Sequence, residues 1–220
     1  MPAMHRTDID DTLADVLVGR RLLAHPFYRR WEAGTLAPGE LGAYAAQYRH
    51  FEAALPGVLE RVASHSDEPG ARALVEANLA DERGAPAHIE LFDGFAAAVG
   101  AGAPGPMTPA TTALVGLYDG LADGPAVAAL AALAAYEVQS AEIAASKADG
   151  LRARYGLDGA ATRFWDVHAA VDQDHGAWIV GALAALGAGA EDVRPAAHAA
   201  AGAWWAFLDE REAAAPPSAS

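Results

Sequence analysis

The chain has 220 residues, of which 53% are hydrophobic and 20% charged, and its formal net charge is −14. This acidic balance argues against a nucleic-acid partner and against binding to an anionic membrane. The absence of cysteine excludes disulfides, thiolate nucleophiles and zinc–thiolate sites. Any metal must therefore be held by His, Asp or Glu side chains.

The composition predicts one helical domain. Its apolar residues are mostly Ala, Leu and Val, and β-branched runs are scarce, which favours helix over strand. We assign residues 1–212 to a single domain and predict that residues 213–220 form a disordered tail. The N-terminus has no apolar signal core, and the uncharged stretch 176–190 is too short to span a bilayer. We therefore expect a cytoplasmic protein without a membrane partner.

Proline and glycine residues divide the chain into predicted helices. Pro38 and Pro69 lie near helix starts, and Pro56 is expected to break the helix that contains it. The segment Gly84-Ala85-Pro86 is expected to disturb another helix. In chain order, the predicted helices cover residues 8–24, 27–32, 38–54, 56–64, 69–99, 111–121, 125–154, 160–186 and 191–212.

Residues 100–105 match the glycine pattern of a dinucleotide-binding loop. That pattern requires a strand before it and a helix that opens on it. Here a predicted helix precedes the glycines, and Pro104 and Pro106 lie within and after them. We interpret the segment as a connector between helices.

His168, Asp172 and His175 are spaced at i, i+4 and i+7, so they share one face of a predicted helix. Two imidazoles and a carboxylate are the ligand set of a non-haem iron or related transition-metal site. Apolar residues lie close to that face, so the three polar groups are expected to point toward the core, where a metal would give them a partner. The alternative is a pair of surface histidines beside a solvated aspartate.

A second pair of candidate ligands, Glu82 and His88, lies upstream. Six residues separate them, which on a straight helix places them about 120° apart. Gly84 and Pro86 lie between them, so the helix is not expected to be straight there. Asp81, seven residues before His88, would face the same way in an unbroken helix and remains an alternative to Glu82.

Glu137 follows an almost wholly apolar run, and a lone carboxylate is costly to bury unless it is paired or bound to a metal. Lys147 lies ten residues further along, roughly 80° away around the helix axis, and is close enough to edge the same cavity. Together the six candidate ligands would suit a two-metal centre inside a helical bundle.

These residues give the chain a resemblance to the haem-oxygenase-like diiron oxidases, and within them to the CADD-type self-sacrificing para-aminobenzoate synthases. The segment between Glu82 and His88 is one residue shorter than the pattern of that branch. The matching stretches lie between about residues 20 and 180 and are His25-Pro26-Phe27-Tyr28 with Trp31, Leu41-Gly42-Ala43-Tyr44, Asn78-Leu79-Ala80-Asp81-Glu82 with Gly84 and His88, Tyr136-Glu137, Lys147, and His168 with Asp172 and His175.

The resemblance implies a seven-helix haem-oxygenase-like (TenA/PqqC-like) bundle without haem. It implies two metal ions, iron with iron or iron with manganese, together with dioxygen, an external reductant and a homodimer. Tyr28 matches the tyrosine that is consumed as the source of the aminobenzoate ring, Lys147 the lysine that gives up its amino group, and Tyr136 a tyrosine that supports radical transfer. The product, para-aminobenzoate, is a folate precursor. The implied metal ligands are Glu82, His88, Glu137, His168, Asp172 and His175.

Other readings stay open at this point. A haem-oxygenase-like diiron oxidase could use the same six ligands on an external amino acid, amine or fatty acid, by N-oxygenation, C–C cleavage or desaturation; Tyr28 and Lys147 would then be dispensable. Thiaminase-like relatives depend on a cysteine, which this chain lacks. Quinone-cofactor oxidase relatives would require the six ligands to be coincidental. A non-enzymatic interaction protein is a third alternative, and metal content would separate these last two alternatives from the diiron oxidases.

Overall fold

A computed structural model of the protein describes residues 2–214, and the side chains of all of these except residues 2–5 and 173. Within this range the chain forms nine α-helices, one short 3-10 helix and no strand, which confirms the all-α prediction. The predicted disordered tail lies outside the described residues except for Ala213, which ends the last helix, and Ala214. The elements are α1 (Pro2–Leu17), η1 (Leu22–Ala24), α2 (Pro26–Ala33), α3 (Pro38–His65), α4 (Pro69–Glu82), α5 (His88–Ala98), α6 (Pro109–Ala122), α7 (Ala126–Tyr155), α8 (Ala160–Ala185) and α9 (Ala190–Ala213).

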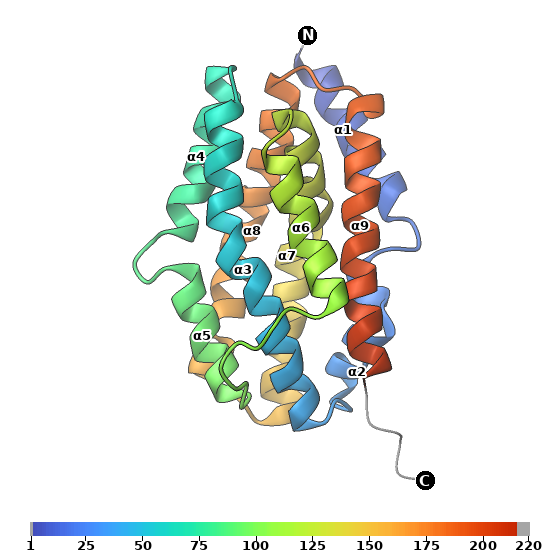
Figure 1. Cartoon of the computed structure of the whole chain (residues 1–220). Coiled ribbons are helices and arrows are strands. Elements are labelled where there is room, and N and C mark those ends of the chain that lie inside the picture. The colour runs from blue at the N-terminus through green and yellow to red at the C-terminus, as the bar shows by residue number, and fades with distance from the viewer. Residues whose placement is uncertain (1, 215–220) are drawn as a thin grey trace.

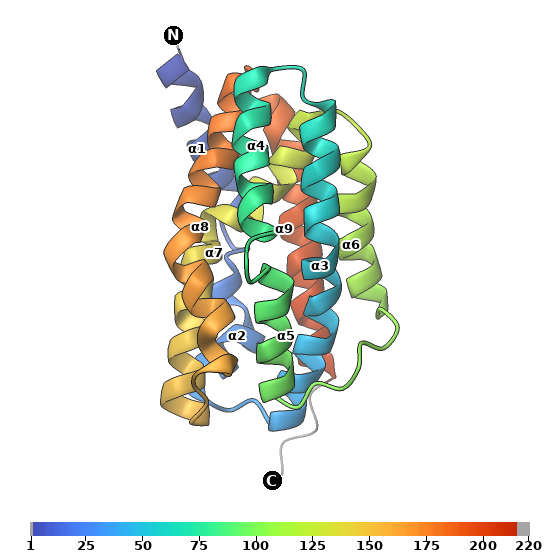
Figure 2. The same cartoon turned by 90° about the vertical axis from the view of Figure 1, so that its left-hand side faces the viewer.

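The helices form an elongated bundle whose axes run roughly along one direction (Figure 1). Helices α4 and α5 follow one another along the side of α3, so that together they occupy the position of one long helix (Figures 1 and 2). Helix α7 packs most extensively on α8 and next on α9, and it also contacts α2, α3 and α6. It is therefore the central helix, and residues on several of its faces point toward other helices.

The apolar composition of α7 follows from this central position. By length and composition it is the one helix in the described part of the chain that could cross a membrane, because it contains an 18-residue stretch with a mean hydropathy of 1.2. However, 72% of that stretch is buried inside the bundle. A helix that is apolar on all sides can be the core helix of a bundle. The apolar residues of α7 are therefore explained by its position in the core of the bundle.

Three predicted helix boundaries were wrong. The first helix begins at Pro2 rather than at residue 8 and ends at Leu17 rather than at residue 24. The chain then reaches η1 through a turn that contains Gly19 at φ 70°. Pro56 does not break α3, which continues from Pro38 to His65. Proline removes one backbone N–H from the helix, but Leu55, Val58 and Leu59 on either side of it are buried, and their packing holds the helix together.

The disturbance predicted near Gly84 is a complete break between two helices. Helix α4 ends at Glu82, Arg83 forms its C-cap, and α5 begins at His88. The side chain of Glu90 accepts a hydrogen bond from the backbone N–H of Ala87 (3.3 Å) and so caps the start of α5. The chain therefore turns between Glu82 and His88, which frees their side chains from the geometry of a straight helix.

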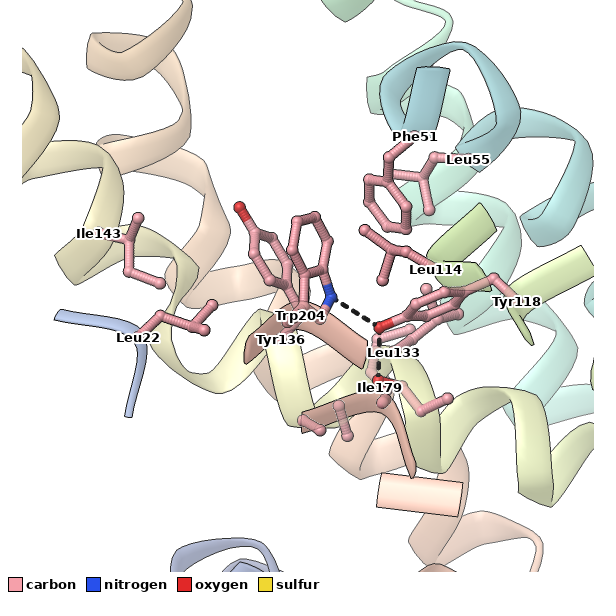
Figure 3. Packing of buried hydrophobic residues seen from close by; sticks show 14 of the residues in the cluster. Leu22, Phe51, Leu55, Leu114, Tyr118, Leu133, Tyr136, Ile143, Ile179 and Trp204 are labelled. Atoms are coloured by element: carbon pink, nitrogen blue, oxygen red, sulfur yellow. Dashed lines mark hydrogen bonds between the residues drawn. The ribbon is translucent and has the colours of Figure 1, made fainter. Parts of the chain in front are cut away.

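Aromatic rings fill the space between α3, α6, α7 and α9 (Figure 3). The Trp204 ring stacks on the Tyr136 ring with their centroids 4.5 Å apart, and its indole N–H donates to the Tyr118 hydroxyl (3.0 Å). That hydroxyl donates in turn to the Ala132 carbonyl (3.0 Å). Phe51 packs edge-on against Trp204 and Tyr118. These contacts pack α3, α6 and α9 around α7.

Candidate metal centre and lysine pocket

All six predicted metal ligands come together in the bundle. Within the described residues they form two groups, and in each group one ligand atom per residue lies within 4.8 Å of the others. The first group comes from the end of α4, the start of α5 and α8, and the second from α7 and α8. The groups are Glu82, His88 and His168, and Glu137, Asp172 and His175.

Helix α8 supplies three of the six side chains on one face, as their spacing predicted, and that face points toward α7 and α5. Gly176 lets α8 come close to α7 here, because a Cβ at this position would lie 3.2 Å from the Glu137 carbonyl oxygen. The Ser140 hydroxyl lies one turn beyond Glu137 and donates a hydrogen bond to its Oε2 (3.3 Å). The close approach of these two helices brings Glu137 beside Asp172 and His175.

The donor atoms in both groups are arranged as they would be around a shared cation. His88 Nδ1 lies 3.1 Å from Glu82 Oε1, and His175 Nδ1 lies 3.4 Å from Asp172 Oδ1. Yet neither His88 Nδ1 nor Asp172 Oδ1 has a hydrogen-bond partner among the described residues, although both are buried. Buried polar atoms without partners are costly. Nitrogen and carboxylate donors that converge in this way fit iron or a related metal ion.

Two further contacts orient the imidazoles. His168 Nδ1 contacts the Phe164 carbonyl oxygen (2.8 Å), so its Nε2 is free to face the centre. His175 Nε2 contacts Asp81 Oδ2 (3.2 Å), so its Nδ1 faces Asp172. Such outer contacts fix the tautomer and orientation of a metal-binding imidazole. Asp81 therefore lies behind His175, with its side chain 46% exposed, whereas the side chain of Glu82 is 3% exposed and lies inside the first group.

The buried acids interact strongly with one another. Burial, with Glu82 nearby, raises the pKa of Glu137 to about 8, and burial together with Glu137 raises the pKa of Asp172. Burial lowers the pKa of His168 to about 4. Burial also acts to raise the pKa of Glu82, but the imidazoles around it outweigh that effect and lower it. A site that favours the neutral form of His168, and whose crowded carboxylates would be stabilised in their charged form by a cation, suits a metal ion.

Lys147 is enclosed by aromatic rings, and these rings form the lysine pocket. It is the only lysine in the chain, and only 1% of it is exposed. Burial lowers the pKa of its amine well below the usual value, so the neutral form is favoured. Its Nζ lies 4.5 Å from the centre of the Tyr28 ring and 4.1 Å from that of Trp165. The Trp31, Tyr44 and Tyr48 ring centres are 5.8, 4.9 and 5.0 Å away.

Neighbouring helices hold this lysine in place. The Trp31 indole N–H donates to the Lys147 carbonyl oxygen (3.2 Å). Gly150, three residues further along α7, leaves room for the indole, because a Cβ there would lie 2.8 Å from Trp31 Cδ1. On α2, the His25 side chain caps the helix by accepting from the Phe27 N–H (3.1 Å), which fixes the turn that carries Tyr28.

Hydrogen bonds between side chains occur at both ends of the pocket. Lys147 Nζ donates to the Tyr44 hydroxyl (2.5 Å), and that hydroxyl lies 2.8 Å from the Tyr28 hydroxyl. The Tyr48 hydroxyl lies 2.5 Å from that of Tyr136, the residue before Glu137. The Tyr44 and Tyr48 rings are 5.4 Å apart between centroids, so aromatic groups connect the two pockets.

Sequence reasoning gave no role to four residues that complete the two pockets, although Tyr44 lies in one of the stretches that carry the resemblance. Tyr44, Tyr48 and Glu52 recur every four residues on the buried face of α3, and this spacing was a signal that could have identified them. Glu52 and Trp165 line the small cavity among the metal ligands, which is the metal pocket. Glu52 Oε2 and Trp165 Nε1 have no hydrogen-bond partner among the described residues. Burial raises the pKa of Glu52 well above its usual value.

Two cavities adjoin the metal ligands. The inner one, lined by five of the six ligands together with Glu52, Tyr48 and Tyr136, has a volume of about 10 Å³. The outer one is an open hollow of about 210 Å³ that Glu137 and Asp172 line from the inside, with Arg6 and Asp10 of α1 at its edge. The inner cavity has room for about one water molecule.

Comparisons with known proteins point to one family. Residues 42–209 match a family described as iron-containing redox enzymes. The chain is 35% identical over 213 residues to a 4-aminobenzoate synthase from Nitrosomonas europaea, across 88% of this chain and 87% of that protein. It is 32% identical over 162 residues to a 4-aminobenzoate synthase from Chlamydia pneumoniae, across 71% of this chain and 72% of that protein.

Solved structures share the fold. A CADD-like protein of unknown function from Nostoc punctiforme aligns with a TM-score of 0.77 at 17% identity, over 97% of this chain and 99% of that chain. A TenA homologue from Pseudomonas syringae pv. tomato aligns with a TM-score of 0.74 at 14% identity, over 93% of both chains. The arrangement of helices is therefore the haem-oxygenase-like one that the resemblance implied, with nine α-helices in residues 2–214 rather than seven.

Proposed function

Because the chain belongs to the haem-oxygenase-like family of iron-containing redox enzymes, we propose that it is a 4-aminobenzoate synthase that uses its own Tyr28 as the source of the ring and Lys147 as the amino donor. Relatives that carry this name are 32% and 35% identical to it. The observation that carries the proposal is the position of Lys147. The only lysine of the chain is buried with its Nζ 4.5 Å from the centre of the Tyr28 ring.

Burial of this amine is hard to explain as packing. Lysine is almost never fully buried unless it is paired, yet the direct contacts of Lys147 Nζ are aromatic rings and a phenol, and Glu52 acts on the amine only electrostatically, too weakly to offset its burial. A neutral amine is a nucleophile, whereas an ammonium is not. The pocket therefore holds an amine in its reactive form against a phenol ring, which is the arrangement that joining the two requires.

The residues of the two groups, Glu82, His88 and His168 with Glu137, Asp172 and His175, would hold the metal ions. We assign two iron ions, or one iron with one manganese; when bound, they would activate dioxygen with electrons from an external reductant and so supply the oxidising power. Tyr136 and Tyr48 would carry oxidation from the metal ions toward Tyr28, since the hydroxyls of Tyr136 and Tyr48 are in contact. The burial of the whole path excludes water from the oxidised rings.

The size of the inner cavity favours an internal substrate. Ligand pockets for small molecules usually have volumes of about 300–1,000 Å³. The cavity among the ligands has only about 10 Å³, and Tyr48 and Trp165, which line it, also contact the Lys147 amine.

A second candidate is oxidation of an external amino acid, amine or fatty acid by the same metal centre. The outer hollow of about 210 Å³ favours it, because Glu137 and Asp172 line that hollow and it is open to solvent. In that case Tyr28 and Lys147 would not be consumed.

The test is incubation of the protein with iron, a reductant and air, followed by mass spectrometry of the protein and of the released small molecules. We expect 4-aminobenzoate and a loss of mass at residue 28. Protein labelled with ε-¹⁵N-lysine should release ¹⁵N-aminobenzoate, and the only lysine makes the source unambiguous. Tyr28→Phe and Lys147→Arg should abolish the product, whereas Tyr155→Phe, which removes a hydroxyl bonded to the Leu36 N–H, should not. An unchanged protein mass with an oxidised bound molecule would support the external substrate instead.

A further inference from the structure

The Tyr44 hydroxyl lies between the two groups that the proposed reaction must join. Lys147 Nζ donates to it at 2.5 Å, and it lies 2.8 Å from the Tyr28 hydroxyl. All three side chains are buried, with exposures of 0–1%. The contacts form a row from the amine nitrogen, through the Tyr44 oxygen, to the Tyr28 oxygen. Because Lys147 donates to Tyr44, the Tyr44 hydrogen is available to the Tyr28 oxygen.

We infer that the Tyr44 hydroxyl is a catalytic proton carrier, which takes protons from the Lys147 amine and delivers them to the Tyr28 oxygen so that this oxygen leaves as water. The inference rests on the proposed function, because it assigns the step in which nitrogen replaces oxygen on the ring. Nothing in the comparisons with known proteins gives Tyr44 a role.

The step balances as a condensation. Dioxygen takes two electrons and two protons from Tyr28 and is itself reduced to the level of hydrogen peroxide, which converts the phenol into a quinone methide in which Cζ is a carbonyl carbon. The Lys147 lone pair forms a C–N bond to Cζ, and the electrons of the C=O bond move to oxygen. Two protons pass from nitrogen to that oxygen through Tyr44, the C–O bond breaks, and one water leaves. A C=N bond then replaces C=O with no further oxidation or reduction.

This step determines what becomes of Lys147. Movement of a proton from Lys147 Cε to Tyr28 Cβ restores the aromatic ring and places the double bond between nitrogen and Cε. Addition of water to that bond separates the nitrogen from Lys147, which leaves an aromatic amine on the side chain of residue 28 and an aldehyde at residue 147. The lysine thus gives up its nitrogen without an additional oxidant.

The need for Tyr44 follows from the dryness of the pocket. In water, solvent would carry protons between the amine and the leaving oxygen. Here the rings of Tyr28, Trp31, Tyr44, Tyr48 and Trp165 surround Lys147 Nζ, and Glu52 acts on it electrostatically. The hydrogen bond that Lys147 Nζ makes among the described residues is to the Tyr44 hydroxyl. A positioned proton donor typically contributes about 10²- to 10⁴-fold to a rate.

The experiment compares wild-type protein with Tyr44→Phe after incubation with iron, reductant and air, and measures the ratio of released 4-aminobenzoate to 4-hydroxybenzoate. We expect the ratio to fall at least ~100-fold in the variant, because the ring still oxidises but keeps its oxygen. A hydrazide reagent should label residue 147 in spent wild-type protein and not in the variant. Tyr118→Phe is the matched control, since it removes a buried hydroxyl outside both pockets, and it should keep the wild-type ratio.

Two measurements do not depend on turnover of the variant. In metal-free protein labelled with ¹³C,¹⁵N-lysine, the single side-chain amine signal should move in Tyr44→Phe and stay in Tyr118→Phe. In wild-type protein, deuterated solvent should lower the ratio of amino to hydroxy product, and this test applies even if the variant does not fold.

An unchanged ratio in folded Tyr44→Phe would overturn the inference, as would loss of both products, which would place Tyr44 in the oxidation itself. An unmoved lysine signal, or a wild-type ratio insensitive to deuterated solvent, would also overturn it. Absence of 4-aminobenzoate from the wild-type protein is a different result, because it contradicts the proposed function and removes the step with it.

Discussion

The hydroxyl of Tyr48 lies 2.5 Å from that of Tyr136, and this contact connects the metal pocket with the lysine pocket. Tyr136 precedes Glu137 on α7, and both line the inner cavity. On α3 the Tyr48 ring lies 5.0 Å from Lys147 Nζ and 5.4 Å from the Tyr44 ring. Two helices that are far apart in sequence thus place the Tyr48 and Tyr136 phenols in contact between the metal ligands and Lys147.

Removal of this contact should slow the chemistry without removing the metal. In Tyr48→Phe the ring remains but the hydrogen bond to Tyr136 is lost, so release of 4-aminobenzoate should fall about 10-fold or more. Iron content should match the wild type, because Tyr48 belongs to neither ligand group. Tyr118→Phe again serves as the control. Product release at the wild-type rate in Tyr48→Phe would show that oxidation reaches Tyr28 by another route, for example through Trp165.

The choice between Glu82 and Asp81 as a ligand can be tested by metal affinity. Asp81→Ala removes only the contact to His175 Nε2, and loss of such an outer partner typically weakens metal binding about 10- to 100-fold. Glu82→Ala removes a buried carboxylate from the first group, and we expect binding at that site to be lost. Competitive titration with a chelator measures both. The reverse order of effects would make Asp81 the ligand.

The stability of the metal-free protein should depend on pH in a specific direction. The pKa of Glu137 is raised from its usual value of 4.5 to about 8, so between these pH values the folded state holds more protons than the unfolded state. Stability from this group is therefore lost as the pH rises toward 8. The pKa of His168 is lowered from 6.5 to about 4, so this group makes the protein more stable as the pH rises, but only below about pH 6.5.

We therefore expect the free energy of unfolding of metal-free protein to fall between pH 6.5 and 8, as measured by denaturant titration. The Glu137→Gln variant should show a weaker dependence. Bound metal competes with protons for the carboxylates, so anaerobic iron-loaded protein should not lose stability over this range. A metal-free protein that gains stability from pH 6.5 to 8 would contradict the assignment of raised pKa values to these buried acids.

Close packing of α2 on α7 predicts the effect of a single methyl group. In Gly150→Ala the new Cβ would lie 2.8 Å from Trp31 Cδ1, and such overpacking costs about 1–3 kcal/mol. Gly57→Ala on α3 is the control, because its Cβ meets nothing within 4 Å and alanine favours a helix by about 0.5–1 kcal/mol. The two variants should shift the midpoint of urea unfolding in opposite directions.

The sequence by itself determined the parts of the protein that depend on a single helix. The spacing of His168, Asp172 and His175 places them on one face whatever the rest of the chain does, because the helical repeat is local. The apolar run before Glu137 likewise marked that carboxylate as buried. The helical fold class followed from composition and from the positions of proline and glycine.

Only the tertiary structure decided what lies between helices. The break at residues 83–87 brings Glu82 to His88 and leaves Asp81 behind His175, and no periodicity predicts the direction of a chain after a break. Lys147 is enclosed by rings from α2, α3 and α8, so its burial depends on how four helices pack. Side-chain burial and contacts across helices arise from packing, and packing is a property of the whole bundle rather than of any one segment.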